Sequence, residues 1–312
     1  MLGELAATDR RVREATVAET PAVRPYVLHW LEGFLPDGLA NALAPTWFTC
    51  VGIAGVVALL AMLAIARRRG LDPGAVASAV VSGYVAAVIC GIALPMLLAS
   101  GEHLYATGHF HVRWSGMTSF CGYIGGAIAF LFACRRERLP IAELGDIAVA
   151  PLGLALVLAR TGCFMAGCDY GAVTSLPWGV SFPAGSPAWR DHVHAGWISP
   201  RALESLPVHP TELYEAAIGL VLVVLALVAA RRNQPPGNLF LAGAAIYAIG
   251  RFFVEALRGD AGRGVYAGIS SGQFFSLAVL LAIAMSIRFR YKPAACPTLS
   301  QPRPTDVPAS VM

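Results

Sequence analysis

Long apolar stretches separated by short polar segments dominate the chain. Four of them carry no charge and reach the roughly 20 residues that a helix needs to cross the hydrocarbon core of a bilayer: 47–66, 75–99, 114–134 and 264–287. Three further stretches are apolar but are interrupted or ended by charged residues: 147–159, 213–230 and 239–257. This pattern predicts an all-α, polytopic membrane protein with about seven transmembrane helices.

The placement of arginine predicts the orientation of these helices, because cytoplasmic loops are enriched in basic residues. Basic clusters follow the first, third, fifth and seventh stretches, at residues 67–69, 135–138, 231–232 and 288–292. The other short loops hold little more than Arg113 and Arg263. We therefore expect the N-terminus outside and the C-terminus inside. The longest interhelical segment, residues 164–210, is then expected to form a structured cap on the outer side.

Composition excludes a soluble enzyme built around one core. Hydrophobic residues make up 56% of the 312 residues and charged residues 13%, with a mean hydropathy of +0.62, whereas a soluble domain carries about 25% charged residues. Residues 1–44 have charges where a secretory signal would have its apolar segment, so we interpret them as an extension on the outer side. Residues 45–290 are the predicted transmembrane domain, and the proline-rich residues 291–312 are expected to be a disordered cytoplasmic tail.

Three charged residues within or at the end of predicted spans, Arg160, Arg251 and Glu255, are candidates for a buried site, because inserting a charge costs about 2.5–3.5 kcal/mol. Tyr247, Arg251 and Glu255 have the spacing i, i+4 and i+8, which places them on one helix face. Arg251 and Glu255 can pair there, either as a structural ion pair or as part of a buried site. Arg160 either ends the fourth span at the interface or belongs to the same site.

Two glycine-rich segments hold candidate thiols. In ARTGCFMAGCDYG, Gly162 and Gly171 allow sharp turns or close approach beside Cys163 and Cys168. In WSGMTSFCGYIGG, small residues around Cys121 allow close helix packing. The cysteine count of seven is odd, which excludes a complete set of intrachain disulfides, and no CxxC pair is present.

The segment HPTELYEA opens the fifth predicted helix. Pro210 suits a helix start, and the acidic residue Glu212 suits the dipole of the first turn. These roles leave His209, Tyr214 and Glu215 unexplained at a membrane boundary, so we treat these three as candidate binding residues. No spacing of histidine or cysteine indicates a metal site, and no cofactor is expected.

Taken together, four segments resemble the prolipoprotein diacylglyceryl transferase family of bacterial inner membranes. WSGMTSFCGYIGG is similar to the family's GGMSFHGG segment, and ARTGCFMAGCDYG is similar to its GRxGNFxNxExxG signature. HPTELYEA is similar to the family's HPxQLYE, and YAIGRFFVEALRGD to its YxxxRFxxEFFRxPD. The order and spacing of the segments agree with the family over roughly residues 45–287, and the family also has seven spans with the N-terminus outside.

The resemblance implies an enzyme that moves the diacylglyceryl group of phosphatidylglycerol, or of another anionic phospholipid, to the lipobox cysteine of a prolipoprotein or to a related acceptor. The product is a thioether, and glycerol phosphate leaves. Guanidinium groups suit the phosphate because they stay charged and bind it with two parallel hydrogen bonds. The implied location is the bacterial inner (cytoplasmic) membrane, without a nucleic-acid partner. The residues carried over as catalytic are Arg160, Tyr247, Arg251 and Glu255, and those carried over as substrate-binding are Gly162, Gly171, His209, Tyr214, Glu215 and Arg258.

Cysteines replace three polar residues of the family pattern. Cys121 stands at its histidine, Cys163 at its signature asparagine and Cys168 at its signature glutamate. We include the three thiols among the candidate catalytic residues, because a thiolate beside a guanidinium can act as nucleophile or base. Two alternatives stay open: a phospholipid-binding protein without catalysis, and a thiol-based redox or metal-binding membrane protein.

Overall fold

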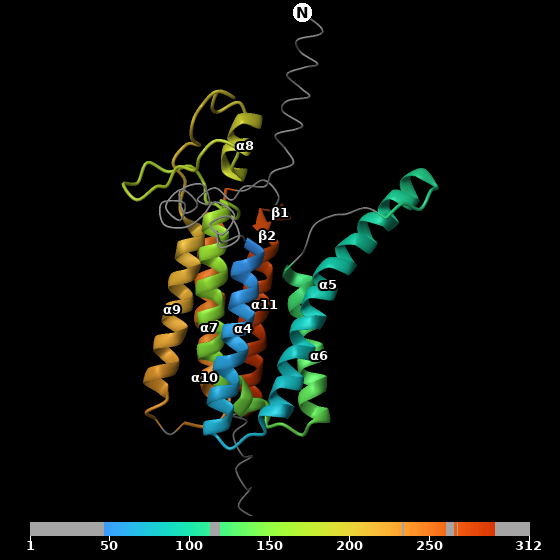
Figure 1. Ribbon diagram of the computed structural model, residues 1–312, viewed down its shortest axis with the longest axis vertical. Helices are drawn as coiled ribbons and strands as arrows, with labels where there is room; N and C mark the ends of the chain where they lie inside the picture. The colour runs from blue at the N-terminus through green and yellow to red at the C-terminus, as the bar shows by residue number, and fades with distance from the viewer. Residues whose placement is uncertain (1–46, 113–118, 233, 260–264, 267, 291–312) are drawn as a thin grey trace, which may run out of the picture.

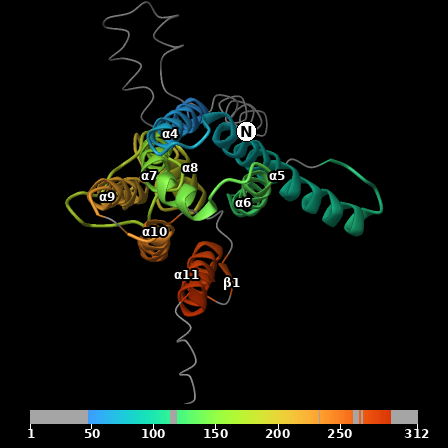
Figure 2. The same ribbon diagram turned by 90° about the horizontal axis from the view of Figure 1, so that it is seen from below.

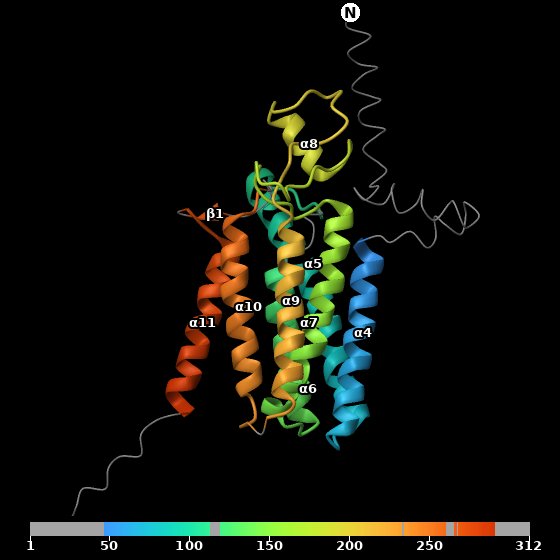
Figure 3. The same ribbon diagram turned by 90° about the vertical axis from the view of Figure 1, so that its left-hand side faces the viewer.

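The computed structural model describes residues 47–112, 119–232, 234–259, 265–266 and 268–290, which form a helical bundle with a cap at one end (Figures 1 and 3). Six of the eight helices in these described residues are long and apolar enough to cross a membrane. The described elements are α4 (Trp47–Arg68), α5 (Pro73–Thr107), α6 (Ser119–Arg136), α7 (Ile141–Ala166), α8 (Pro187–His194), α9 (Thr211–Ala229), α10 (Asn238–Ala256), β1 (Val265–Tyr266), β2 (Ile269–Ser270) and α11 (Ser271–Arg290).

The all-α, polytopic class predicted from the sequence is confirmed. The six spanning helices are α4, α5, α7, α9, α10 and α11. Helix α6 occupies the predicted third span, whose first residues, 114–118, lie outside the described part of the chain. The predicted N-terminal extension and C-terminal tail lie outside it as well.

Helix α7 is the central helix of the bundle and packs against α4, α9 and α10 (Figure 2). Its crossing with α9 is made at two glycines, Gly153 and Gly219. A Cβ atom on either glycine would lie 2.7 Å from the carbonyl oxygen of the other. The close approach brings the apolar faces of the helices together around Val149, Leu222 and Leu239.

The glycine-rich start of α6 packs against α5, as the small-residue pattern predicted. A Cβ on Gly122 would lie 3.0 Å from the carbonyl oxygen of Ala87, and one on Gly126 would lie 3.0 Å from that of Gly83. Helix α5, which contains Pro95, continues past the bundle, and its C-terminal part leads away from it (Figure 1).

The basic clusters gather at one end of the bundle and the cap lies at the other. Arg67 and Arg68 end α4, and Arg135 and Arg136 end α6. Arg231 and Arg232 follow α9 at that same end (Figure 1). The cap holds α8 and a small core around Tyr170, Phe182 and Val208. This arrangement agrees with the predicted orientation, in which the cap faces outward.

Replacing Gly153 by Ala should destabilise the bundle by about 1–3 kcal/mol, because the new methyl group meets backbone rather than a movable side chain. The matched control is Gly52→Ala on α4, where a Cβ meets nothing within 4 Å. The control should be neutral or stabilising by up to about 1 kcal/mol through helix propensity. Thermal unfolding of the two variants in detergent checks this. Equal melting temperatures would contradict the packing described for α7 and α9.

Candidate functional site

A short extended segment after α7 joins the ends of three helices at the cap end of the bundle. The backbone N–H of Gly171 donates to the carbonyl of His209 at 2.9 Å, and that of Ala172 donates to the carbonyl of Leu257 at 2.7 Å. The N–H of Gly259 donates to the carbonyl of Tyr170 at 3.1 Å. Residues 170–172 are therefore held between the segment that precedes α9 and the segment that follows α10.

Glycine at position 171 is required by this arrangement. A Cβ there would lie 2.5 Å from both the Cβ and the carbonyl oxygen of His209. We therefore assign Gly171 a role in joining the segments, while its predicted part in substrate binding stays a prediction. Gly162, the other glycine of the signature, is buried in the last turns of α7.

Six charged side chains from these elements form a closed ring in which positive and negative groups alternate. Arg160 of α7 contacts Asp169 and Glu215, with Nη1 2.7 Å from Oδ2 of the aspartate and Nε 2.8 Å from Oε2 of the glutamate. Glu215 also contacts Arg251 through its Oε1 atom. The two remaining members, Glu255 and Arg258, close the ring.

The second half of the ring runs along the end of α10. Nη2 of Arg251 lies 2.6 Å from Oε2 of Glu255, and Nη1 of Arg258 lies 4.0 Å from the same oxygen. Nη2 of Arg258 lies 2.5 Å from Oδ1 of Asp169, which returns to the starting point. Three guanidinium groups thus face three carboxylates, and the formal charge of the ring is zero.

Burial makes each contact in the ring energetically important. The side chains of Glu215 and Glu255 are 2% and 3% exposed, and those of Arg160 and Arg251 are 13% and 14% exposed. Removing one member of a buried ion pair costs about 3–5 kcal/mol, because the partner keeps a charge that water no longer solvates. Asp169, at 33%, is the most exposed member, so the ring is open to solvent on the cap side.

Asp169 lies beyond the end of α7, and its carboxylate contacts two guanidinium groups. Burial alone would raise the pKa of its carboxyl, but the guanidinium groups of Arg258 and Arg160 outweigh burial and hold that pKa below its usual value. The backbone of Asp169 has a φ of +64°, a left-handed conformation that aspartate tolerates better than most residues. This conformation turns the side chain back toward the helix ends.

The structure brings most of the predicted polar residues into one network. The predicted pair of Arg251 and Glu255 is confirmed, and Arg160 joins it through Glu215 rather than ending α7 at the interface. Sequence reasoning missed Asp169 as a member of the site. Its only signal was its place in the signature segment, directly after Cys168.

The predicted residues His209, Tyr214 and Tyr247 lie beside the ring without an ion pair to it. The ring nitrogen Nδ1 of His209 lies 3.2 Å from the hydroxyl of Tyr214, and that hydroxyl accepts a 2.8 Å hydrogen bond from Nε1 of Trp178 in the cap. Tyr247 lies one turn before Arg251 on α10 and packs against the α7, α9 and α10 core. Trp178 is therefore a further polar contact at the cap side that the sequence did not single out.

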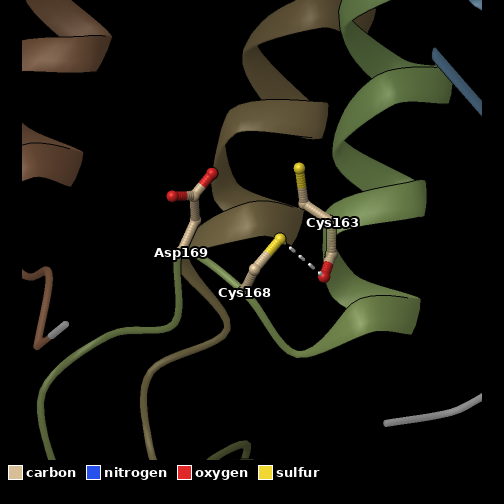
Figure 4. A group of neighbouring side chains, drawn as sticks. All are labelled: Cys163, Cys168 and Asp169. Atoms are coloured by element: carbon tan, nitrogen blue, oxygen red, sulfur yellow. Dashed lines mark hydrogen bonds between the residues drawn. The ribbon is translucent and has the colours of Figure 1, made fainter. Parts of the chain in front are cut away.

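Two of the three candidate thiols come together, and the third lies on another part of the bundle. The ligand atoms of Cys163, Cys168 and Asp169 all lie within 4.8 Å of one another (Figure 4). Cys121 lies in the first turn of α6, which packs mainly against α5, and no described hydrogen bond, ion pair or ligand cluster joins it to Cys163 or Cys168. The hypothesis of three converging thiols is therefore supported only for Cys163 and Cys168, at the end of α7.

The Cys168 thiol is not activated by its surroundings. A hydrogen bond to the Cys163 side chain and burial raise the pKa of the Cys168 thiol well above its ordinary value. The nearest guanidinium contact to this pair is weak, since Nη1 of Arg160 lies 3.9 Å from Sγ of Cys163. For Cys168, the expected guanidinium effect is thus outweighed, and the protonated thiol is favoured.

Two neighbouring residues complete the surroundings of the site. Glu212, in the first turn of α9, is fully buried, and neither of its carboxylate oxygens has a hydrogen-bond partner among the described residues. Gly272, in the first turn of α11, lies against Glu255, where a Cβ would come 2.7 Å from the carboxyl carbon. Glycine at this position therefore leaves room for the Glu255 carboxylate.

Comparisons with known proteins point to one family. Residues 41–288 match the family described as prolipoprotein diacylglyceryl transferase. Similar relatives carry the name phosphatidylglycerol–prolipoprotein diacylglyceryl transferase. The one from Geobacter sulfurreducens is 31% identical over 257 residues, which cover 77% of this chain and 89% of the relative. The one from Clostridium tetani is 28% identical over 231 residues, covering 74% and 86%, and the one from Vibrio vulnificus is 28% identical over 279 residues, covering 84% and 95%.

Replacing Asp169 by Asn should lower the melting temperature at pH 7 and should matter progressively less in acid. A carboxyl whose pKa is depressed in the folded state stabilises the protein above its unfolded pKa, about 3.9 for aspartate, and that contribution is lost as the pH falls through the folded value. The difference in melting temperature between wild type and variant should therefore shrink below about pH 4. The control, Glu204→Gln on the exposed surface of the cap, should shift the melting temperature little at any pH. A difference for Asp169→Asn that stays constant down to pH 3 would contradict the ring contacts of Asp169.

Proposed function

The chain belongs to the prolipoprotein diacylglyceryl transferase family, and from this premise we propose that it transfers the diacylglyceryl group of phosphatidylglycerol to a prolipoprotein cysteine at the charged ring. In this reaction the thiol sulfur forms a bond to the terminal glyceryl carbon of the lipid. The bond from that carbon to the phosphate oxygen breaks, glycerol phosphate leaves, and the thiol proton passes to a base. The site must therefore stabilise a phosphate and accept a proton.

The observation that carries the proposal is the ring itself. It presents the guanidinium groups of Arg160, Arg251 and Arg258 at one end of a membrane-spanning bundle. A guanidinium group has five N–H donors in a fixed plane, so each arginine of the ring has more donors than its carboxylate contacts use. The phosphate of the lipid can bind such donors while the carboxylates keep the arginines in position.

The carboxylates of the ring suit a mechanism of partner exchange. When a phosphate binds Arg251, it competes with Glu255 for the same guanidinium, which lies 2.6 Å from the carboxylate. The displaced Glu255 carboxylate is then available to accept the proton of the incoming thiol. Because the formal charge of the ring is zero, the ring is stable inside the apolar bundle when no phosphate is bound. Cys168 is a poor candidate for the base, because the raised pKa of its thiol favours the protonated form.

The location of the ring fits the path of both substrates. The ring lies at the end opposite the basic clusters, which the positive-inside tendency places in the cytoplasm. The reaction would then take place at the outer boundary of the bacterial inner membrane, where headgroup phosphates of the outer leaflet are at the same depth. The thiol acceptor reaches this boundary once its polypeptide has crossed the membrane.

A second candidate function is lipid binding without transfer, and the observation that favours it is the replacement of family polar residues by Cys121, Cys163 and Cys168. The two functions differ in one measurement. Reconstituted protein is supplied with phosphatidylglycerol and a peptide carrying a lipobox cysteine. A lipidated peptide identifies a transferase, whereas bound phosphatidylglycerol without product identifies a binding protein.

Replacing Arg160 or Arg251 by Gln should reduce transfer by at least about 100-fold, since electrostatic stabilisation of a transition-state charge by one donor is worth about 100- to 1,000-fold. Lysine should restore part of the activity at most, because it keeps the charge but loses the planar pair of hydrogen bonds. The matched control is Arg136→Gln at the opposite end of the bundle, where the side chain is 75% exposed.

The measurement is the initial rate of peptide lipidation in proteoliposomes, with the yield of folded protein checked by size-exclusion chromatography. This check is required because breaking the ring also destabilises the fold. Full activity of well-folded Arg251→Gln protein would contradict the proposed role of the ring.

A further inference from the structure

We infer that the end of α7 forms a binding site for a thiophilic divalent metal ion, with zinc as the ion that its donors fit best. The donors are the thiols of Cys163 and Cys168 and the carboxylate of Asp169, whose ligand atoms lie within 4.8 Å of one another (Figure 4). A carboxylate has about four lone-pair positions, so Asp169 can coordinate an ion while each of its oxygens keeps its contact with an arginine.

The turn that ends α7 brings the two thiols together. The N–H of Cys168 donates to the carbonyl of Cys163 at 3.2 Å, and Gly167 before it has a φ of +66°. This is the helix ending in which a left-handed glycine folds the chain back over the last turn. The thiol of Cys168 consequently lies 3.7 Å from the carbonyl oxygen of Cys163. The five-residue spacing of Cys163 and Cys168 matches no metal-binding motif. The two thiols are close only because the turn at Gly167 folds the chain back.

A second observation points to a cation at the same place. Glu212 is 0% exposed, and both of its carboxylate oxygens lack a hydrogen-bond partner among the described residues. Its charge interacts with those of Cys163 and Asp169, so it lies beside the thiol pair rather than facing lipid. A buried carboxylate without a partner is costly, and coordination of a metal ion would provide the missing partner. We therefore assign Glu212 as the fourth donor of the proposed site.

Two sulfur and two oxygen donors match the tetrahedral preference of zinc, and sulfur donors disfavour magnesium and calcium. Binding proceeds as Zn²⁺ replaces the two thiol protons, which are released to solvent, so affinity should rise with pH. Arg160, whose Nη1 atom lies 3.9 Å from Sγ of Cys163, offsets part of the negative charge that the thiolates and carboxylates would place around the ion. The inference does not depend on the transfer reaction, since it uses only the donors and their geometry.

The test uses the full-length protein in detergent, kept reduced, stripped with a chelator and then equilibrated with zinc. Bound zinc per chain is measured by elemental mass spectrometry, and the same samples are titrated with cobalt to record the thiolate-to-cobalt absorption band. We expect one zinc per chain and a cobalt band typical of two thiolates. The variant Cys163→Ser/Cys168→Ser should lose both signals. The matched control Cys90→Ala/Cys134→Ala, which removes two thiols from other parts of the bundle, should keep both.

Glu212→Gln should weaken zinc binding by at least about tenfold while keeping the thiolate band. As a measurement that needs no variant, saturating zinc should protect Cys163 and Cys168 of the wild type from alkylation, with Cys90 as the internal reference. Three results would overturn the inference: wild type that binds no zinc, zinc content unchanged in the thiol double variant, or a Cys163–Cys168 disulfide that forms readily while zinc leaves the thiols unprotected.

Discussion

The fold of this protein depends on the mutual neutralisation of six charges inside an apolar bundle. No member of the ring is stable in that environment without its neighbours, because an unpaired charge in a bilayer costs several kilocalories per mole. Arg160, Glu215 and Arg251 come from three different helices, so satisfying their charges fixes how α7, α9 and α10 sit against one another. The glycine contact between Gly153 and Gly219 lets the same helices approach closely enough for the ring to close. Packing in the middle of the bundle and ion pairing at its end therefore specify one arrangement.

Local spacing made part of this site predictable. Arg251 and Glu255 are one helical turn apart on one helix, so their pairing followed from the period of the helix alone. The contacts of Arg160 with Glu215 and Asp169 join separate elements, and only the three-dimensional path of the chain shows them. Asp169 was missed because its role depends on its left-handed backbone conformation and on its contact with Arg258, which is distant in sequence. Cys121 was grouped with the other thiols by motif, whereas the packing of α6 against α5 places it elsewhere.

The end of α7 combines two kinds of chemistry within a few residues. The family signature has a glutamate where this chain has Cys168, yet the next residue, Asp169, supplies a carboxylate to Arg160 and Arg258. The ring is thus complete, although Cys163 and Cys168 stand where the family signature has an asparagine and a glutamate. The buried carboxylate of Glu212 lies near both Asp169 of the ring and Cys163. The carboxylates that pair with the arginines are thus largely distinct from the thiols that replace polar residues of the family pattern. Asp169 belongs to both clusters, because it pairs with Arg160 and Arg258 and also lies beside the two thiols.

The order in which the ring members are synthesised has a consequence for biogenesis. Arg160 leaves the ribosome before Glu215, and Glu215 leaves before Arg251 and Glu255. During co-translational insertion, α7 and Asp169 therefore enter before Glu215, the partner of Arg160 on α9, has been synthesised. A chain that ends before α10 contains Arg160 and Glu215 but lacks Arg251, Glu255 and Arg258, so the ring cannot close. The ring is complete only once α10 and Arg258 are in place, so truncated or misinserted chains that lack them differ from mature ones by unpaired charge that membrane quality control can recognise.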